Sequence, residues 1–112
     1  MYYNIPTTIN TVQNNFGYTW QFTCQDSAGA VVNLTNAALT FTAQLESDLN
    51  ITFSNPMSII SAPAGTCQYT VLAADFPTPG VYQGQIVANY SSSTEIVTFA
   101  GITINVTAQL PT

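Results

Sequence analysis

The sequence predicts an all-β protein, more narrowly an immunoglobulin-like antiparallel β-sandwich of about seven strands. Three observations lead to this prediction. Apolar and polar residues alternate along most apolar segments, which is the two-residue period of a strand with one buried face. Turn-forming residues separate these segments at intervals of roughly 8–12 residues. No segment has the 3.6-residue period of an amphipathic helix.

The predicted strands follow one another along the chain, and each has one apolar face. Residues 19–25 read TWQFTCQ and residues 38–46 read ALTFTAQLE, and the same alternation recurs in residues 66–72 and 81–90. Strands of this kind bury one face in a core and leave the other to solvent or to a partner. The residues predicted to fill the core are Trp20, Phe22, Leu39, Phe41, Tyr69, Tyr82, Ile86 and Ile104.

The last predicted strand, residues 95–106, changes its alternation partway along. Apolar side chains stand at odd positions before Gly101 and at even positions after it. A β-bulge at this glycine would turn the strand and account for the change. Two weaker segments, residues 51–54 and 57–60, predict a short hairpin at the edge of a sheet.

The chain has 112 residues, of which 46% are apolar, and this predicts a single domain with one small core. That domain spans residues 16–112, and residues 1–15 precede it as either an N-terminal arm or a first strand. As an arm, the segment would bury large side chains on a partner, because such residues dominate interface energetics. As a strand, it would pack on its own sandwich. The candidate partner-binding residues are Tyr2, Tyr3, Ile5 and Pro6.

The chain has five acidic residues and no lysine, arginine or histidine, so its net charge is −5. We therefore expect no binding to nucleic acid or to anionic membrane surfaces, because both depend on cationic side chains. No apolar run approaches the roughly 18 residues of a transmembrane helix, and no signal peptide is visible. Hydroxyl nucleophiles need a general base such as histidine or lysine, so we expect neither enzymatic activity nor a cofactor.

Cys24 and Cys67 lie on the predicted core faces of two strands. One interpretation is a disulfide between these strands, which would stabilise the fold by about 2–4 kcal/mol. The other is a pair of buried free thiols in a protein assembled in the cytosol. The cysteine pairing of antibody domains is absent, because Gly84 stands two residues after Tyr82, where the second cysteine belongs. A closed zinc site needs four ligands, so two cysteines do not predict one.

Glu46, Asp48 and Asn50 alternate in a predicted loop and carry oxygen ligands of the kind that calcium binds. The loop lacks the glycine of a calcium-binding loop, so we favour a solvated turn and expect no metal. The two carboxylates do not predict glycoside hydrolysis either, since that chemistry needs two acids held across a sugar-binding cleft.

A series of short motifs resembles the N-terminal immunoglobulin-like domain family of phage baseplate upper proteins. A strand ends at Asp26, a turn with a glycine follows, and an apolar-x-Leu-Thr step leads into the next strand. Asp75 precedes a later turn. The resemblance covers residues 16–106. The motifs, in order, are DSAGAVVNLTNAALTF at 26–41, PAGTCQYTV at 63–71, GVYQGQIVANY at 80–90 and GITINV at 101–106.

The resemblance implies a bacteriophage virion component that inserts into a larger symmetric assembly. Members of that family are usually the N-terminal module of a longer chain, whereas this sequence ends at Thr112. A free-standing domain of this kind suits a tail or baseplate accessory and a capsid decoration protein equally. We expect a capsid decoration or cement protein that binds and stabilises neighbouring capsid subunits, with the tail or baseplate accessory role as the alternative. A third hypothesis is a host-carbohydrate-binding module in which exposed tyrosines such as Tyr2, Tyr3 or Tyr90 stack on sugars.

The expected partners are other virion proteins, either the major capsid protein or baseplate proteins, together with further copies of this chain. A protein without cationic residues is not attracted to packaged DNA, which favours the outer surface of the virion. Its assembly would take place in the host cytoplasm. Low charge density also suits extensive burial in protein contacts, because few ions must lose their hydration.

Overall fold

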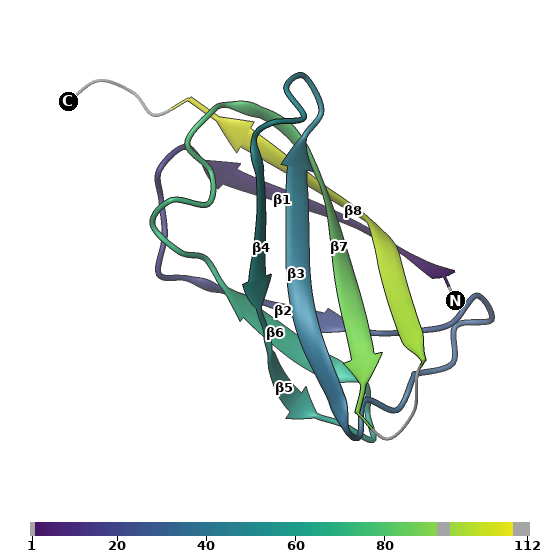
Figure 1. The fold of residues 1–112 in the computed structure, drawn as a ribbon. Helices are drawn as coiled ribbons and strands as arrows, with labels where there is room; N and C mark the ends of the chain where they lie inside the picture. The colour runs from purple at the N-terminus through teal and green to yellow at the C-terminus, as the bar shows by residue number, and fades with distance from the viewer. Residues whose placement is uncertain (1, 92–94, 109–112) are drawn as a thin grey trace.

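The computed structural model describes residues 2–91 and 95–108 and confirms the all-β sandwich (Figure 1). The end of the predicted domain, residues 109–112, and the side chain of Tyr2 lie outside the described part. The strands are β1 (Tyr2–Val12), β2 (Thr19–Thr23), β3 (Ala37–Leu45), β4 (Thr52–Pro56), β5 (Ser58–Ser61), β6 (Thr66–Thr70), β7 (Gly80–Tyr90) and β8 (Ile96–Thr107).

The strands form a five-stranded sheet with the order β1-β8-β7-β3-β4 and a three-stranded sheet with the order β2-β6-β5. This order matches the immunoglobulin arrangement, in which the third, seventh and eighth of these strands share one sheet. Neighbouring strands are antiparallel except β1 and β8, which are parallel. The parallel pair departs from the predicted, fully antiparallel sandwich. No hairpin constrains β1 and β8, because they come from opposite ends of the domain.

The predicted edge hairpin of residues 51–54 and 57–60 is wrong. β4 pairs with β3 in the five-stranded sheet, whereas β5 pairs with β6 in the three-stranded sheet. The chain crosses between the sheets at Met57, whose N–H donates to the carbonyl oxygen of Leu39 at 3.0 Å. Pro56 has no N–H with which to extend the β4 ladder, so the crossing falls directly after it.

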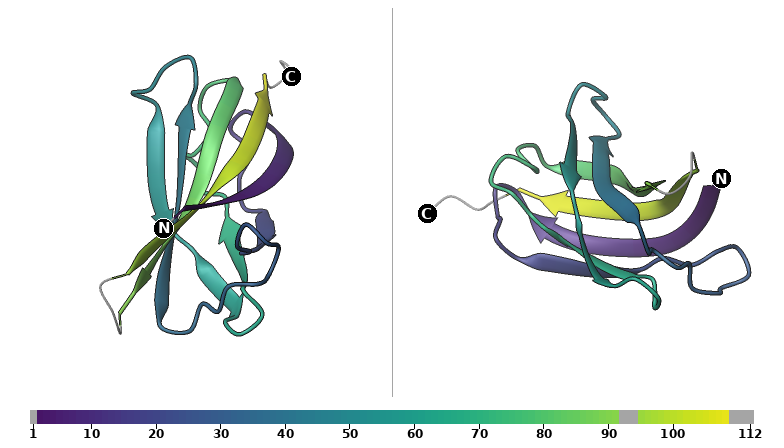
Figure 2. Two further views of the ribbon diagram at one scale, coloured as in Figure 1. Left: turned by 90° about the vertical axis from the view of Figure 1, so that its right-hand side faces the viewer. Right: turned by 60° about the horizontal axis from the view of Figure 1, so that its bottom comes forward.

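Aromatic residues fill the space between the two sheets, whose different strand directions are visible in Figure 2. The ring of Phe41 stacks on Tyr69 with centroids 4.7 Å apart and on Phe22 at 5.8 Å. A Cβ atom on Gly84 would lie 3.1 Å from Cζ of Phe41. The Phe41 ring therefore fills the space that the disulfide of an antibody domain would occupy. All residues predicted for the core are buried except Trp20 of β2, which is partly buried and packs against the core.

The β-bulge predicted at Gly101 is confirmed. The pairing of β7 with β8 shifts register between Gly84 and Ile86, and the buried side chains of β8 change from Phe99 to Ile102 across the glycine. Gly101 has a φ of +92°, which lies in the left-handed region that favours glycine. The bulge keeps both halves of β8 facing the core and also interrupts the outer face of the sheet.

Tyr82, near the start of β7, fixes the corner that leads into this strand. Its hydroxyl donates to the carbonyl oxygen of Thr78 at 2.8 Å, and its ring is fully buried. A tyrosine that hydrogen-bonds a few residues back at this corner is a feature of immunoglobulin-type sandwiches. Burial raises the pKa of the Tyr82 phenol, because the charged form would lose its hydration.

Candidate interaction surface

Charge is absent from both sheets in the part of the chain that the structure describes. None of the described strands contains an acidic residue. The acids stand in the segments between strands, and the chain has no basic side chain with which to pair them. These acids are Asp26, Glu46, Asp48, Asp75 and Glu95. Each face of the sandwich is therefore electrically neutral.

The outer face of the five-stranded sheet is lined by hydroxyl and amide side chains. β3 and β7 supply most of them. Every second residue of a strand points outward, and in these two strands several of the outward residues are threonine or glutamine. The members that are partly or fully exposed include Thr40, Thr42, Gln44, Thr52, Ser54, Gln83, Gln85, Thr98, Thr103 and Asn105. We call this surface the outer five-strand face.

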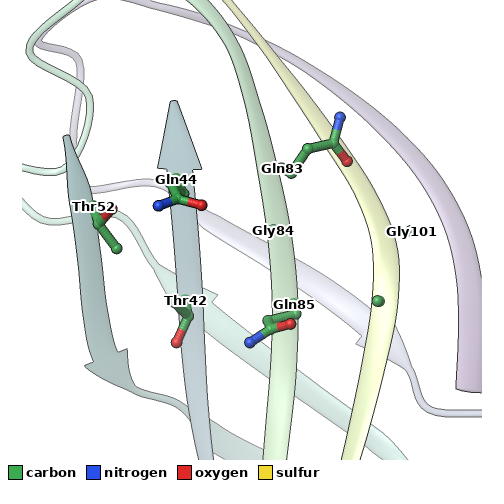
Figure 3. A pocket seen from close by; sticks show the side chains of 8 residues that line it. Thr42, Gln44, Thr52, Gln83, Gly84, Gln85 and Gly101 are labelled. Carbon is green, nitrogen blue, oxygen red and sulfur yellow. The ribbon is translucent and has the colours of Figure 1, made fainter. Parts of the chain in front are cut away.

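The outer five-strand face is hollowed near its centre (Figure 3). The hollow has a volume of about 480 Å³. Gly84 of β7 and Gly101 of β8 contribute only backbone to its lining. Its lining is Thr42, Gln44, Thr52, Gln83, Gly84, Gln85, Ala100 and Gly101. The hollow thus presents neutral donors and acceptors from side chains and from backbone.

Some polar groups of this face hydrogen-bond to one another. Thr42 Oγ1 and Ser54 Oγ lie 2.9 Å apart, and the amide of Gln44 donates to the carbonyl oxygen of Leu49 at 3.0 Å. The Gln83 amide donates to the carboxylate of Glu46, at the margin of the face. Within the described residues, the side-chain amide of Gln85 has no hydrogen-bond partner. It is the group of this hollow best placed to bond to another molecule.

A second polar cluster, around Asp75, is internal. The Asp75 side chain is 4% exposed and accepts hydrogen bonds from the Tyr69 hydroxyl, from Asn55 Nδ2 at 3.0 Å and from the Leu72 N–H at 2.9 Å. Burial, and then the bond to Asp75, raise the pKa of Tyr69. Buried polar groups are stabilised when they are hydrogen-bonded, and here each carboxyl oxygen of Asp75 has a donor without any cation nearby: Oδ1 accepts from Asn55, and Oδ2 accepts from Tyr69 and Leu72. This cluster holds β4, β6 and the turn before β7 together.

The two cysteines lie close together inside the sandwich. Cys24 and Cys67 are fully buried, and their Sγ atoms are 3.9 Å apart as free thiols. The contact with Cys67, and then burial, raise the pKa of Cys24, so its reactive thiolate form is suppressed. The described residues contain no group of three histidine, cysteine or acidic side chains that could hold a metal ion.

The acidic loop after β3 forms a turn closed by its own side chains. The N–H of Asn50 donates to Asp48 Oδ1 at 3.1 Å, and the N–H of Ile51 donates to the carbonyl oxygen of Asp48 at 3.0 Å. Glu46 is engaged by Gln83. These oxygen atoms therefore serve the turn and the edge of the outer five-strand face, and they do not converge on one point.

The candidate partner-binding residues of the N-terminal segment lie in β1, at the edge of the five-stranded sheet. Ile5 is buried in the core, and the ring of Tyr3 packs on Phe99 with centroids 5.7 Å apart. Pro6 is exposed. The third hypothesis required exposed tyrosines, but Tyr3 and Tyr90 are both partly buried, and the Tyr90 hydroxyl donates to the carbonyl oxygen of Asn33 at 2.8 Å. Neither side chain is fully exposed.

Sequence reasoning placed the residues of the outer five-strand face on outward positions but did not single them out as a surface. The signal was available, since β3 and β7 both carry Thr or Gln at successive outward positions and β8 breaks at Gly101. The role of Asp75 was missed because its donors, Asn55 and Tyr69, come from distant points of the chain.

Comparison with known proteins does not assign a family, as no family model and no curated protein matches the chain. Among the described residues there is also no helix long and apolar enough to cross a membrane.

Proposed function

We propose that the chain is a bacteriophage virion structural protein, and more narrowly a capsid decoration or cement protein. It would bind neighbouring capsid subunits on the outer surface of the particle and hold them together. The observation that carries this proposal is the outer five-strand face, a broad surface of neutral hydrogen-bonding groups without a single charged strand residue. No charged strand residue has to be desolvated when such a face is covered by another protein.

Two further observations support a binding role over a chemical one. The carboxylate at Asp75 is enclosed and engaged by three donors, so it is not available to a substrate. The thiols at Cys24 and Cys67 are fully buried. Because the chain has no histidine, lysine or arginine, a nucleophile would have no usual general base beside it.

The proposal is tested first by location. Mass spectrometry of purified particles from the virus that encodes the chain should detect it, and cryo-electron microscopy should place it on the capsid exterior. Density on the tail or baseplate would replace the capsid role with the accessory role that the family resemblance implies. Absence of the chain from purified particles would refute both.

A matched pair of variants tests the surface. Gln85→Lys places an unpaired charge in the hollow of the outer five-strand face, whereas Ala64→Lys makes the same charge change in an exposed turn between β5 and β6. We expect Gln85→Lys to lose particle binding while Ala64→Lys retains it, with both variants folded by circular dichroism. Equal binding by the two variants would show that another surface makes the contact.

A further inference from the structure

The edges of the two sheets are not equally protected. Exposed strand edges invite pairing with other chains, and proteins usually guard them with prolines, bulges or charges. β1 contains Pro6 and a shift of register, and β4 ends in Pro56. β5 is four residues long and has a register shift between Ile59 and Ser61. β2 is the remaining edge strand, and it has none of these features.

β2 is a regular strand with a continuous register against β6, from Thr19 opposite Thr70 to Thr23 opposite Thr66. The backbone N–H and C=O groups of its even-numbered residues point toward β6. This follows from the bonds at its two ends, where the N–H of Val71 donates to Tyr18 O at 3.0 Å and the N–H of Cys24 donates to Gly65 O at 2.8 Å. Backbone groups alternate in an antiparallel pair, so those of the odd-numbered residues point away from β6.

Among the described residues, no strand pairs with β2 on the side toward which these groups point. β1 lies on the same side of the sandwich but pairs with β8 in the other sheet (Figure 2). Between β1 and β2 there is a hollow of about 260 Å³, lined by residues 4–7 of β1, by residues 21–23 of β2 and by Gln25. Within the described chain, β2 therefore pairs only with β6, and its outward backbone groups have no partner strand.

The sequence of this edge is close to a palindrome. β2 reads Thr-Trp-Gln-Phe-Thr, with Gln21 at the centre, an aromatic residue on each side and a threonine at each end. An antiparallel copy centred on Gln21 places threonine opposite threonine and glutamine opposite glutamine. A two-fold interface needs such self-complementarity, because the same residues meet from both sides. We propose that β2 pairs with β2 of a second copy of this chain across a two-fold axis at Gln21.

Charge favours a second copy at this place. Every copy carries only acids, so two copies can meet without repulsion only where the acids are far apart. The acid that follows β2 in the sequence is Asp26, five residues from the centre of the proposed pair. At about 3.3 Å per residue the two Asp26 positions would be roughly 33 Å apart, against a screening length of about 8 Å at physiological salt. Their repulsion is negligible.

Exposed apolar residues stand at both ends of the same strand. Phe16, before β2, is 60% exposed, and Val31, in the hairpin after β2, is 51% exposed. The antiparallel register brings Phe16 of one copy near the segment after β2 of the other, twice by symmetry. Val31 lies on the β6 side of β2, because the N–H of Val32 donates to Cys24 O at 2.9 Å, so the added burial comes from Phe16. This adds apolar burial to the backbone hydrogen bonds of the strands.

The pairing is expected to be weak in isolation. A five-residue edge with its flanks covers less than the roughly 1,200 Å² of a stable standard interface, so a dissociation constant in the micromolar range or above is expected. The inference uses a different surface from the outer five-strand face, and it holds whether or not the chain belongs to a virion.

Two variants of one residue test the pairing. Gln21→Lys and Gln21→Glu each place like charges opposite one another at the two-fold axis, and Gln21 is exposed, so the fold should survive. Sedimentation velocity from about 10 μM to about 1 mM should show dimers of the unmodified chain and a dissociation constant about fivefold weaker for each variant alone. An equal mixture of the two variants should recover dimerisation, because lysine then faces glutamate.

Controls use the other sheet and a covalent trap. The same pair of substitutions at Ser54, on edge strand β4, should leave dimerisation unchanged. Gln21→Cys should give a disulfide-linked dimer on mild oxidation, because residues of a hydrogen-bonded pair have Cα atoms about 5.5 Å apart. Ser54→Cys should not. A chain that stays monomeric throughout, or dimers that are indifferent to Gln21→Lys and Gln21→Glu, would overturn the inference.

Discussion

The two faces of the five-stranded sheet differ in chemistry although the same strands form both. The inner face is apolar and aromatic, and the buried carboxylate near it, Asp75 of the segment between β6 and β7, accepts hydrogen bonds from Tyr69, Asn55 and the backbone. The outer face has hydroxyls and amides, leaves Gln85 without a partner within the described chain and is hollowed near its centre. The inner face therefore determines stability, and the outer face is suited to association. The following substitutions test how separate these roles are.

Phe41→Ala should have the largest effect on stability. Phe41 is fully buried and stacks on both Tyr69 and Phe22, which link it to the other sheet. Truncating a buried phenylalanine costs about 3–5 kcal/mol through lost contacts and the cavity left behind. Urea unfolding at neutral pH would measure this loss. A cost below that of an exposed substitution such as Gln85→Ala would show that the aromatic stack does not hold the sheets together.

Asp75→Asn should have the next largest effect, a loss of about 2–3 kcal/mol in the free energy of unfolding. The new amide NH2 would face groups that now donate hydrogen bonds to the Asp75 carboxylate. Asp26→Asn is the matched control. Asp26 Oδ1 accepts the N–H groups of Ala28 and Ala30 in an exposed turn, and an asparagine oxygen can accept the same two bonds. Equal unfolding free energies for the two variants would contradict a structural role for the internal cluster.

Gly101→Ala should cost about 1–3 kcal/mol from its left-handed backbone alone. It should cost more than Gly29→Ala, although Gly29 also has a positive φ of 84°. A Cβ at Gly29 meets nothing, whereas a Cβ at Gly101 would overlap the Asn4 side chain of β1. The difference between the two unfolding free energies measures the closeness of β1 to the bulge. Equal unfolding free energies would mean that Asn4 and β1 move aside at no cost.

The smallest effect concerns alkaline pH. The pKa of Tyr69 is raised by burial and by Asp75, and that of Tyr82 is raised by burial. Below about pH 10 these phenols are protonated in both states, so they leave stability unchanged. Above it the unfolded chain ionises first and binds fewer protons, so stability falls as pH rises. Urea unfolding at several values above pH 9 should show a shallower decline for Tyr69→Phe. An identical decline would place the titrating groups elsewhere.

The sequence predicted the sandwich because alternation and turn residues are local signals. The alternation of β3 and β7 identified the buried side of each, and the change at Gly101 located the bulge. Long-range pairing was less accessible. The crossing at Met57 replaced the predicted hairpin because the choice of sheet depends on contacts with Leu39 and β6, which are distant in sequence. The parallel pairing of β1 with β8 has no local signal for the same reason.

The candidate surface was only partly predictable. A two-residue period tells which side chains point outward, so the neutrality of Gln83 and Gln85 could be seen in the sequence. The hollow could not be seen in the sequence, because its lining comes from four strands that are spread along the chain. Whether β1 is a strand or an arm was also left open, since the apolar side chains of Tyr3 and Ile5 suit both.

The most direct measurement is the salt dependence of binding between the purified chain and virus particles that lack it. If association uses neutral hydroxyl and amide groups, the dissociation constant should change by less than about twofold between roughly 50 mM and 500 mM sodium chloride. Weakening by tenfold or more over the same range would mean that the loop acids make the contacts, and the neutral face would lose its proposed role.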